Sequence, residues 1–310
     1  MLSRRNIRVK VMQALYALNR DEELTIAQAL RAYEKSTENS FVLYLFNLYA
    51  LLQICRFAKV DAQKRHAKYL PSEEDLKFTD KFYTNALIQS LVKHPVLQKK
   101  FKEMHFEARI DQDLIRKMYK DFSAEEPYRA YIQNENATDD DHVDILHELY
   151  RFIRRNEVFN EMVEDLYATW EDDKSLVVGA VKKSLKALPA EANFLDEYQV
   201  QSETYQFGIQ LLNRTAQDDA KIQEIFEPTL KNWDVERLAL IDTILIKMAI
   251  AEFLYFKSIP TKVTLNEYVE VSKQYSTAKS KDFINGILDK VMKQLQDDGL
   301  IKKEGRGLVD

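Results

Sequence analysis

Glycine and proline are scarce in this chain, with six of each among 310 residues. Proteins on average contain about 7% glycine and 5% proline. Barrels, sandwiches and propellers join their strands by turns that depend on these two residues, so the scarcity nearly excludes such folds. No two glycines lie close together before Gly299, which also excludes a glycine-rich phosphate loop. A helical chain is therefore expected.

Apolar residues recur at three- and four-residue steps along most of the chain, as in amphipathic helices. The predicted helices after an initial one at residues 3–20 span roughly 24–35, 40–69, 73–92, 95–107, 110–121, 125–134, 139–155, 157–169, 174–188, 202–215, 218–230, 234–256, 260–275 and 280–297. Residues 189–201 are expected to be a connection. The predicted fold class is all-α.

The most apolar stretch runs from Phe41 to Cys55, contains Asn47 and Gln53, and ends at Arg56. It is shorter than the roughly 20 apolar residues that a membrane span needs, so a buried core helix is predicted and no membrane partner. No signal-peptide pattern follows the basic N-terminus. A single cysteine cannot form an internal disulfide, and a cytoplasmic location is expected.

The net charge is −5, but the charges are unevenly distributed. The first 20 residues hold five cations and no acid, whereas residues 135–148 hold six acids and no base. A local basic arm on an acidic chain suits selective contact with RNA. The alternative is a set of solvated helix faces.

The first helix combines an apolar stripe with polar side chains beside it. At 100° per residue, Arg5, Arg8, Met12 and Tyr16 are predicted on a flank of the stripe, with Gln13 further round. Such a helix can pack on a core and still present cations, an amide and an aromatic ring.

The sequence contains no recognisable catalytic constellation. None of the five histidines has a partner at the i,i+4 spacing of a two-histidine metal site, and no nucleophile or nucleotide-binding motif is present. No enzyme activity, cofactor or metal site is predicted.

Two segments carry a specific family pattern. The first is RRNIR at residues 4–8 followed by MQALY at residues 12–16. The second runs from Trp233 to Lys290 and includes WDVERL at 233–238, IPTKVTLNE at 259–267 and KDFINGILDK at 281–290. These segments resemble the NusB family of transcription antitermination factors, over residues 3–20 and roughly 200–296.

The resemblance implies a NusB-like helical bundle of two subdomains, enlarged by a helical insertion. The expected parts are the arginine-rich first helix at 1–22, an extra helical region at 23–190 that contains the N-terminal subdomain and the insertion, a C-terminal subdomain at 191–298, and a flexible tail at 299–310. The implied function is binding of boxA-type single-stranded RNA together with NusE, a small-subunit ribosomal protein. This complex would promote read-through by RNA polymerase, notably in ribosomal RNA operons.

The resemblance and the chemistry of single-stranded RNA binding together give candidate site residues. Those for RNA are Arg4, Arg5, Arg8, Lys10, Gln13, Tyr16, Lys279, Lys281 and Phe283. The cations would contact phosphates, Gln13 would read a base edge, and Tyr16 would stack on a base or pack on a partner. Asp242 is, after Tyr16, the second candidate contact with the partner NusE. Its alternative is an intrachain role. Phe283 has the alternative of an ordinary core residue.

Two further expectations concern the last helix. Lys279 replaces an acidic residue common in the family and is expected to strengthen RNA contact. Gly286 is expected to let two helices approach closely, with Asn266 and Asn285 forming hydrogen bonds across the contact.

The sequence leaves two alternative functions to compare. One is a helical protein-interaction scaffold, which would have the same fold but no specific RNA-binding site. Certain RNA cytosine-5 methyltransferases carry a NusB-like domain, but they need a cofactor-binding α/β domain and a catalytic cysteine, and Cys55 lies in the apolar stretch.

Overall fold

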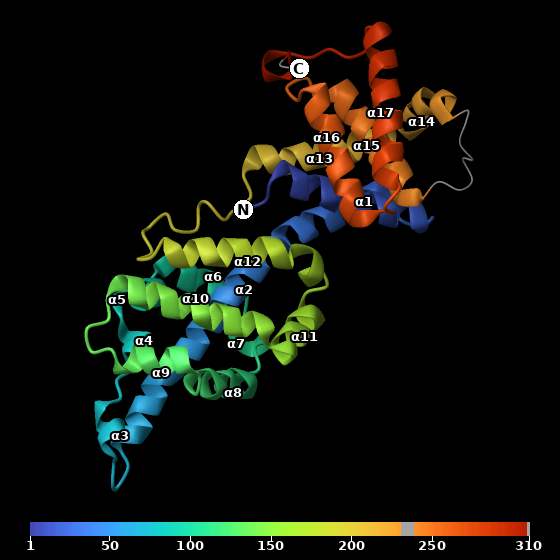
Figure 1. Ribbon diagram of the computed structural model, residues 1–310. Coiled ribbons are helices and arrows are strands. Elements are labelled where there is room, and N and C mark those ends of the chain that lie inside the picture. The colour runs from blue at the N-terminus through green and yellow to red at the C-terminus, as the bar shows by residue number, and fades with distance from the viewer. Residues whose placement is uncertain (231–238, 309–310) are drawn as a thin grey trace. The chain divides into compact units, whose positions relative to one another are not determined.

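The structure is a computed structural model that describes residues 1–230 and 239–308 (Figure 1). Every regular element in these residues is helical, which confirms the all-α fold class. The chain forms two compact units. We call Leu2–Thr37 with Val200–Asp310 the α1 unit, and Glu38–Gln199 with Met1 the insert unit. The boundaries between the two units, at 37/38 and 199/200, lie later in the chain than the expected boundaries at 22/23 and 190/191.

The α1 unit is a helical bundle around one strongly apolar helix, α15 (Leu240–Tyr255). Its other elements are α1 (Arg4–Arg20), the beginning of α2 (Ile26–His66), α13 (Ser202–Gln217), α14 (Asp219–Phe226), η1 (Glu227–Leu230), α16 (Thr261–Tyr275), α17 (Ser280–Asp297) and η3 (Gly305–Leu308). Helices α1, α13, α16 and α17 all pack on α15 (Figure 1). This packing explains why α15 is apolar on every side.

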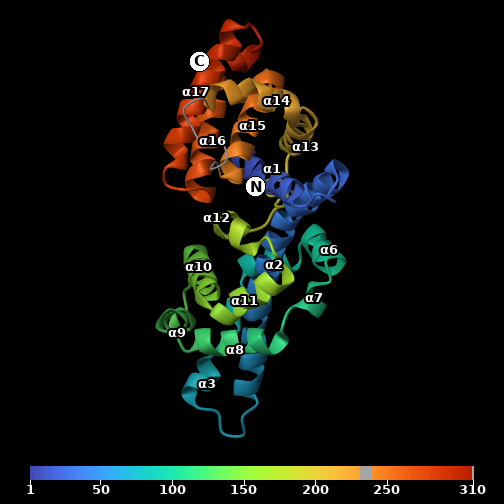
Figure 2. The same cartoon turned by 90° about the vertical axis from the view of Figure 1, so that its right-hand side faces the viewer.

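The insert unit holds most of α2 and ten further helices among the described residues. These are α3 (Glu73–Lys77), α4 (Lys81–Thr84), α5 (Ala86–Val92), α6 (Pro95–Glu103), α7 (Phe106–Arg109), α8 (Gln112–Ser123), α9 (Glu126–Gln133), α10 (Asp139–Arg155), α11 (Glu157–Leu166) and α12 (Trp170–Lys186). One continuous apolar core runs from Leu43 to Tyr198 and is rich in edge-to-face aromatic pairs. Figure 2 shows α8 crossing α2 in this unit.

Helix α2 is long and apolar enough to cross a membrane by length and composition alone. Its most apolar part lies inside the insert unit, where Leu43, Phe46, Leu51 and Cys55 are fully buried. The prediction of a buried core helix for this stretch is confirmed. The expected break between residues 35 and 40 is wrong, because α2 continues through it without a proline or glycine.

Other helix boundaries differ from the predicted ones where a polar residue interrupts the helix. The predicted helix 73–92 is three helices, since Asn85 accepts a hydrogen bond from the Ile88 amide and starts α5 anew. The predicted helix 95–107 divides at His105, which has a positive φ of 52°. The predicted helix 234–256 is described from Leu240 onward, and the WDVERL motif lies outside the described residues.

The expectation of a close helix contact at Gly286 is wrong. Gly286 is exposed, and a Cβ placed on it would meet no atom of the described residues within 4 Å, so none of their helices makes a close contact that requires this glycine. Asn266 and Asn285 are also exposed. The segment after residue 298 is held on the α1 unit, where Lys303 donates to the carbonyl of Phe256 at 2.9 Å.

Candidate RNA-binding surface

Helix α1 begins with a capping box. The Ser3 side chain accepts a hydrogen bond from the Asn6 amide, and the Asn6 side chain accepts one from the Ser3 amide. The first turn contains Arg4 and Arg5 and no acid. Cations at a helix N-terminus oppose the helix dipole at a cost of about 0.3–1 kcal/mol each. The sequence therefore places these arginines against the local preference of the helix.

Arg8 is buried, so the prediction that it lies on a solvent-facing flank is wrong. Only 2% of the residue is exposed, and its guanidinium donates two hydrogen bonds to Glu252, at 2.6 and 2.9 Å. Glu252 also accepts from Thr264 and Tyr268. Burial alone would lower the pKa of Arg8, but the carboxylates of Glu252 and Glu267 outweigh it and hold the pKa above its ordinary value. This network locks α1 onto α15 and α16.

Lys10 and Met12 are buried as well, with exposures of 4% and 3%. The Lys10 ammonium donates to the Ser36 hydroxyl at 3.1 Å, near the beginning of α2. The buried side of α1 is thus wider than the apolar stripe alone, because it includes two cations that have partners inside the unit.

Arg4 and Arg5 are exposed at the N-terminal end of α1. Arg5 donates to Glu267 on α16 at 2.7 and 2.9 Å, and these hydrogen bonds lower the pKa of Glu267. Within the part of the chain that the structure describes, the Nη1 group of Arg5 has no hydrogen-bond partner. The guanidinium of Arg4 lies 5.5 Å from the Phe207 ring centroid. A cavity of about 380 Å³, lined by both arginines, Val263 and Glu267, opens beside them.

The exposed face of α1 also carries the predicted amide and aromatic ring. Residues 5, 13, 16 and 20 fall within an arc of about 80° on a helical projection. Arg5, Tyr16 and Arg20 are exposed on this arc, with Tyr16 at 39%, and Gln13 is half-buried. The structure therefore places a cation, an amide, a phenol ring and a second cation in sequence along one face, which we call the α1 face.

The candidates near the last helix divide into exposed and buried residues. Lys279 and Lys281 are exposed at the beginning of α17, where free backbone amides also favour an anion. Phe283 is 9% exposed and belongs to the buried side of α17. Its alternative as a core residue is what the structure shows.

Asp242 takes the intrachain role that was its alternative. Its carboxylate is buried and accepts hydrogen bonds from the Ser276 hydroxyl at 2.5 Å and the Ser280 hydroxyl at 2.7 Å. These bonds tie the beginning of α15 to the beginning of α17. The side chain has no exposed surface of consequence to offer a partner.

Glu252 and Glu267 are the residues that the sequence analysis missed. An acid in the apolar middle of a helix, such as Glu252 in the run AIAEFL of α15, indicates a buried cationic partner, because an unpaired buried carboxylate is very costly. Which of the arginines supplies the partner depends on a contact across 244 residues, and this cannot be read from spacing.

The comparisons with known proteins show the family of this chain. A sequence model described as the NusB family matches residues 178–293. The transcription antitermination protein NusB of Salinibacter ruber is 34% identical over 155 residues, which cover 50% of this chain and 91% of that protein. This chain belongs to the NusB family.

Two other NusB proteins match over shorter stretches. That of Chloroherpeton thalassium is 41% identical over 104 residues, 34% of this chain and 49% of that protein. That of Natranaerobius thermophilus is 43% identical over 91 residues, 29% of this chain and 66% of that protein. No solved structure matches. As a NusB-family member the chain is a transcription antitermination protein and not an enzyme.

Proposed function

We propose that this chain binds boxA-type single-stranded RNA together with NusE and thereby promotes read-through by RNA polymerase, notably in ribosomal RNA operons, in the cytoplasm. The observation that carries the proposal is the α1 face, on which Arg5, Gln13, Tyr16 and Arg20 follow one another. Single-stranded RNA is bound by cations along its phosphates and by rings on which its bases stack. The α1 face offers both on one rigid helix.

We assign two roles to the predicted residues. Arg4 and Arg5 contact phosphate, Gln13 reads a base edge, and Tyr16 stacks on a base or packs on NusE. Arg8 and Lys10 act by holding α1 in place, because their charged groups are buried and hydrogen-bonded within the unit.

A second contact is proposed at the beginning of α17. Lys279 and Lys281 are exposed there and provide charge, whereas Phe283 supports the helix from the core. Replacing Lys279 with glutamate is expected to weaken RNA binding several-fold, since one favourable phosphate contact becomes a repulsion. A Lys279→Glu variant that binds boxA RNA as tightly as the parent would exclude this contact.

The experiment is binding of the purified protein to boxA-type RNA and to a scrambled RNA, with and without NusE, over a salt series. The proposal predicts selective binding that tightens with NusE and weakens with salt, because counterions are released from the phosphates. It also predicts that Arg5→Ala/Tyr16→Ala lowers the affinity ratio between the two RNAs.

The alternative function is a protein-interaction scaffold without specific RNA binding. The insert unit, which adds a second core to the chain, is the observation that favours it. Equal and weak binding to both RNAs in every condition would favour the scaffold over the RNA-binding proposal.

A further inference from the structure

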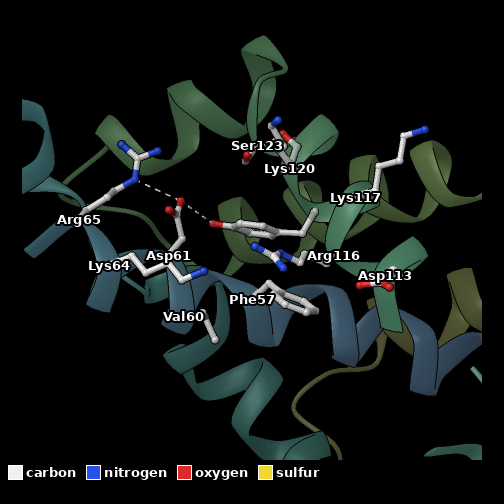
Figure 3. Close-up of a pocket in the computed structure, with 11 residues that line it drawn as sticks. Phe57, Val60, Asp61, Lys64, Arg65, Asp113, Arg116, Lys117, Lys120 and Ser123 are labelled. Atoms are coloured by element: carbon white, nitrogen blue, oxygen red, sulfur yellow. Dashed lines mark hydrogen bonds and ion pairs between the residues drawn. The ribbon is translucent and has the colours of Figure 1, made fainter. Parts of the chain in front are cut away.

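The insert unit contains a cavity of about 490 Å³ between α2 and α8 (Figure 3). One wall is the face of α2 that carries Phe57, Val60, Asp61 and Lys64, at helical steps of three and four residues. The other wall is formed by α8, from its exposed residues Asp113, Arg116, Lys117 and Lys120 together with the buried Tyr119. We call this cavity the α2/α8 groove. It lies outside residues 178–293, which the family model matches.

The groove gathers cations in a unit that is acidic. Residues 38–199 contain 23 lysines and arginines and 29 aspartates and glutamates. The lining of the groove nevertheless has five cations and two acids: Lys64, Arg65, Arg116, Lys117, Lys120, Asp61 and Asp113. Charge of one sign in a concave site attracts ligands of the opposite sign.

Four of the five cations are left for a ligand. Arg65 donates to Asp61 at 3.1 Å, and the Tyr119 hydroxyl donates to the same carboxylate at 3.1 Å, so this acid is already satisfied (Figure 3). The other four are exposed: Lys64, Arg116, Lys117 and Lys120. Within the described residues, 1–230 and 239–308, none of these four cations forms an ion pair. Asp113 forms none there either.

An aromatic ring lies among these cations. Phe57 is half-buried in the groove and stacks on Tyr119, with ring centroids 6.2 Å apart and an interplanar angle of 28°. The phenylalanine keeps part of its surface open, while Tyr119 is buried beneath it. A cationic groove with an accessible aromatic ring is the arrangement that binds single-stranded nucleic acid with little sequence preference.

We propose that the α2/α8 groove is a second binding site for single-stranded RNA, with Lys64, Arg116, Lys117 and Lys120 on phosphates and Phe57 against a base. Three of the four charges follow one another along α8, where Arg116 and Lys120 are one helical turn, about 6 Å, apart, and Lys64 lies on the α2 wall. This favours an extended polyanion over a single phosphate group. The site is independent of boxA recognition and adds affinity without adding sequence preference.

The test compares two double variants of the full chain that each remove two charges at i,i+4 spacing from exposed helix positions. Arg116→Gln/Lys120→Gln changes the groove, and Lys182→Gln/Lys186→Gln on α12 is the matched control. Binding of a labelled 12-nucleotide oligouridylate is measured from low to high salt. Each phosphate contact contributes about 0.7 to the slope of log K against log salt, so the groove variant should lose about 1.4 and the control almost nothing.

A third variant isolates the aromatic contact. Phe57→Leu keeps the apolar packing and should weaken oligouridylate binding several-fold without changing the salt slope. Uridine monophosphate and poly-glutamate serve as competitors. Unlabelled oligouridylate is the reference competitor. Displacement by the mononucleotide at the same phosphate concentration as this reference would overturn the proposal in favour of a small-molecule site. Displacement by poly-glutamate at a lower charge concentration than this reference requires would overturn it in favour of an acidic-protein site.

The outcome is separable from that of the boxA proposal. The groove variant should lower the affinities for boxA and scrambled RNA by the same factor, which leaves their ratio unchanged. Parent-like oligouridylate binding and an unchanged salt slope in the groove variant would refute the groove site, even if boxA preference were found. Weaker oligouridylate binding together with a smaller salt slope in the groove variant would support the site, even if the parent showed no boxA preference.

Discussion

Arg8 and Glu252 form a buried ion pair, and Glu252 also accepts hydrogen bonds from Thr264 and Tyr268. Buried pairs of this kind are weak evidence of net stability, but removal of one partner leaves an uncompensated charge. They do fix geometry, and here the pair fixes the angle of α1, so that Arg5 and Tyr16 point outward.

Replacing Arg8 with alanine is expected to destabilise the protein by about 3–5 kcal/mol, because Glu252 is then buried without its cation. Arg5→Ala should cost at most about 1 kcal/mol, since 47% of that side chain is exposed. Urea unfolding measures both. Adding Glu252→Gln to Arg8→Ala should recover part of the loss, and strict additivity of the two changes would contradict the pairing.

Glu267 gives the ion pairs a dependence on pH. Hydrogen bonds from Arg5 lower its pKa below the ordinary 4.5, so its contribution to stability is present above that value and is lost as pH falls through the lower, folded value. The stability difference between the parent and Glu267→Gln should be constant from pH 5 to 8 and shrink below about pH 4.5. A difference that grows on acidification would reverse the assigned sign.

At the level of helices, Gly208 sets how closely α13 approaches its neighbours. A Cβ on this residue would lie 2.1 Å from the Tyr33 hydroxyl oxygen and 2.7 Å from Cγ2 of Ile7, and both residues are fully buried. Gly208→Ala is therefore expected to destabilise the α1 unit by about 1–3 kcal/mol through overpacking.

Two other helical glycines provide the control for Gly208. Gly179 and Gly286 have open space where a Cβ would be placed. Alanine at either position should raise the melting temperature slightly, because alanine is the better helix former by about 1 kcal/mol. If all three substitutions shifted stability in the same direction, the close packing around Gly208 would be refuted.

Helix boundaries could be predicted where a cap or a punctuation residue marks them. Helices α10 and α17 begin and end at the predicted residues, and α10 has a capping box at Thr138. The continuity of α2 could not be predicted, because Glu38, Asn39 and Ser40 form a local polar break that packing overrides. Ser40 donates to Asp173, a contact between distant parts of the insert unit.

The candidate site could be predicted only in part, because contacts between distant residues again decide which side chains are buried. Periodicity placed Arg5 and Tyr16 on the outer face correctly, because neither is needed in the core. It could not separate Arg8 and Lys10 from them, since burial of a cation depends on an acid or hydroxyl supplied from elsewhere in the chain. The same limit applies to Asp242, which is used by two serines more than 30 residues away.

At the scale of the whole molecule, the chain combines a NusB-type helical bundle with an additional unit that has its own core. The α1 face and the α2/α8 groove lie on different units, and each carries cations beside an exposed or half-exposed aromatic ring. The proposals assign sequence selection to the first and general affinity to the second. Both predict that RNA binding weakens with salt, whereas only the first predicts dependence on boxA.

The most direct measurement is terminator read-through in transcription with purified RNA polymerase and NusE, on templates with a boxA or a scrambled sequence upstream of the terminator. The account predicts that the parent raises read-through on the boxA template alone, that Arg5→Ala/Tyr16→Ala loses this increase, and that Lys182→Gln/Lys186→Gln keeps it. Equal read-through on both templates, or an unchanged increase in the α1-face variant, would contradict the account.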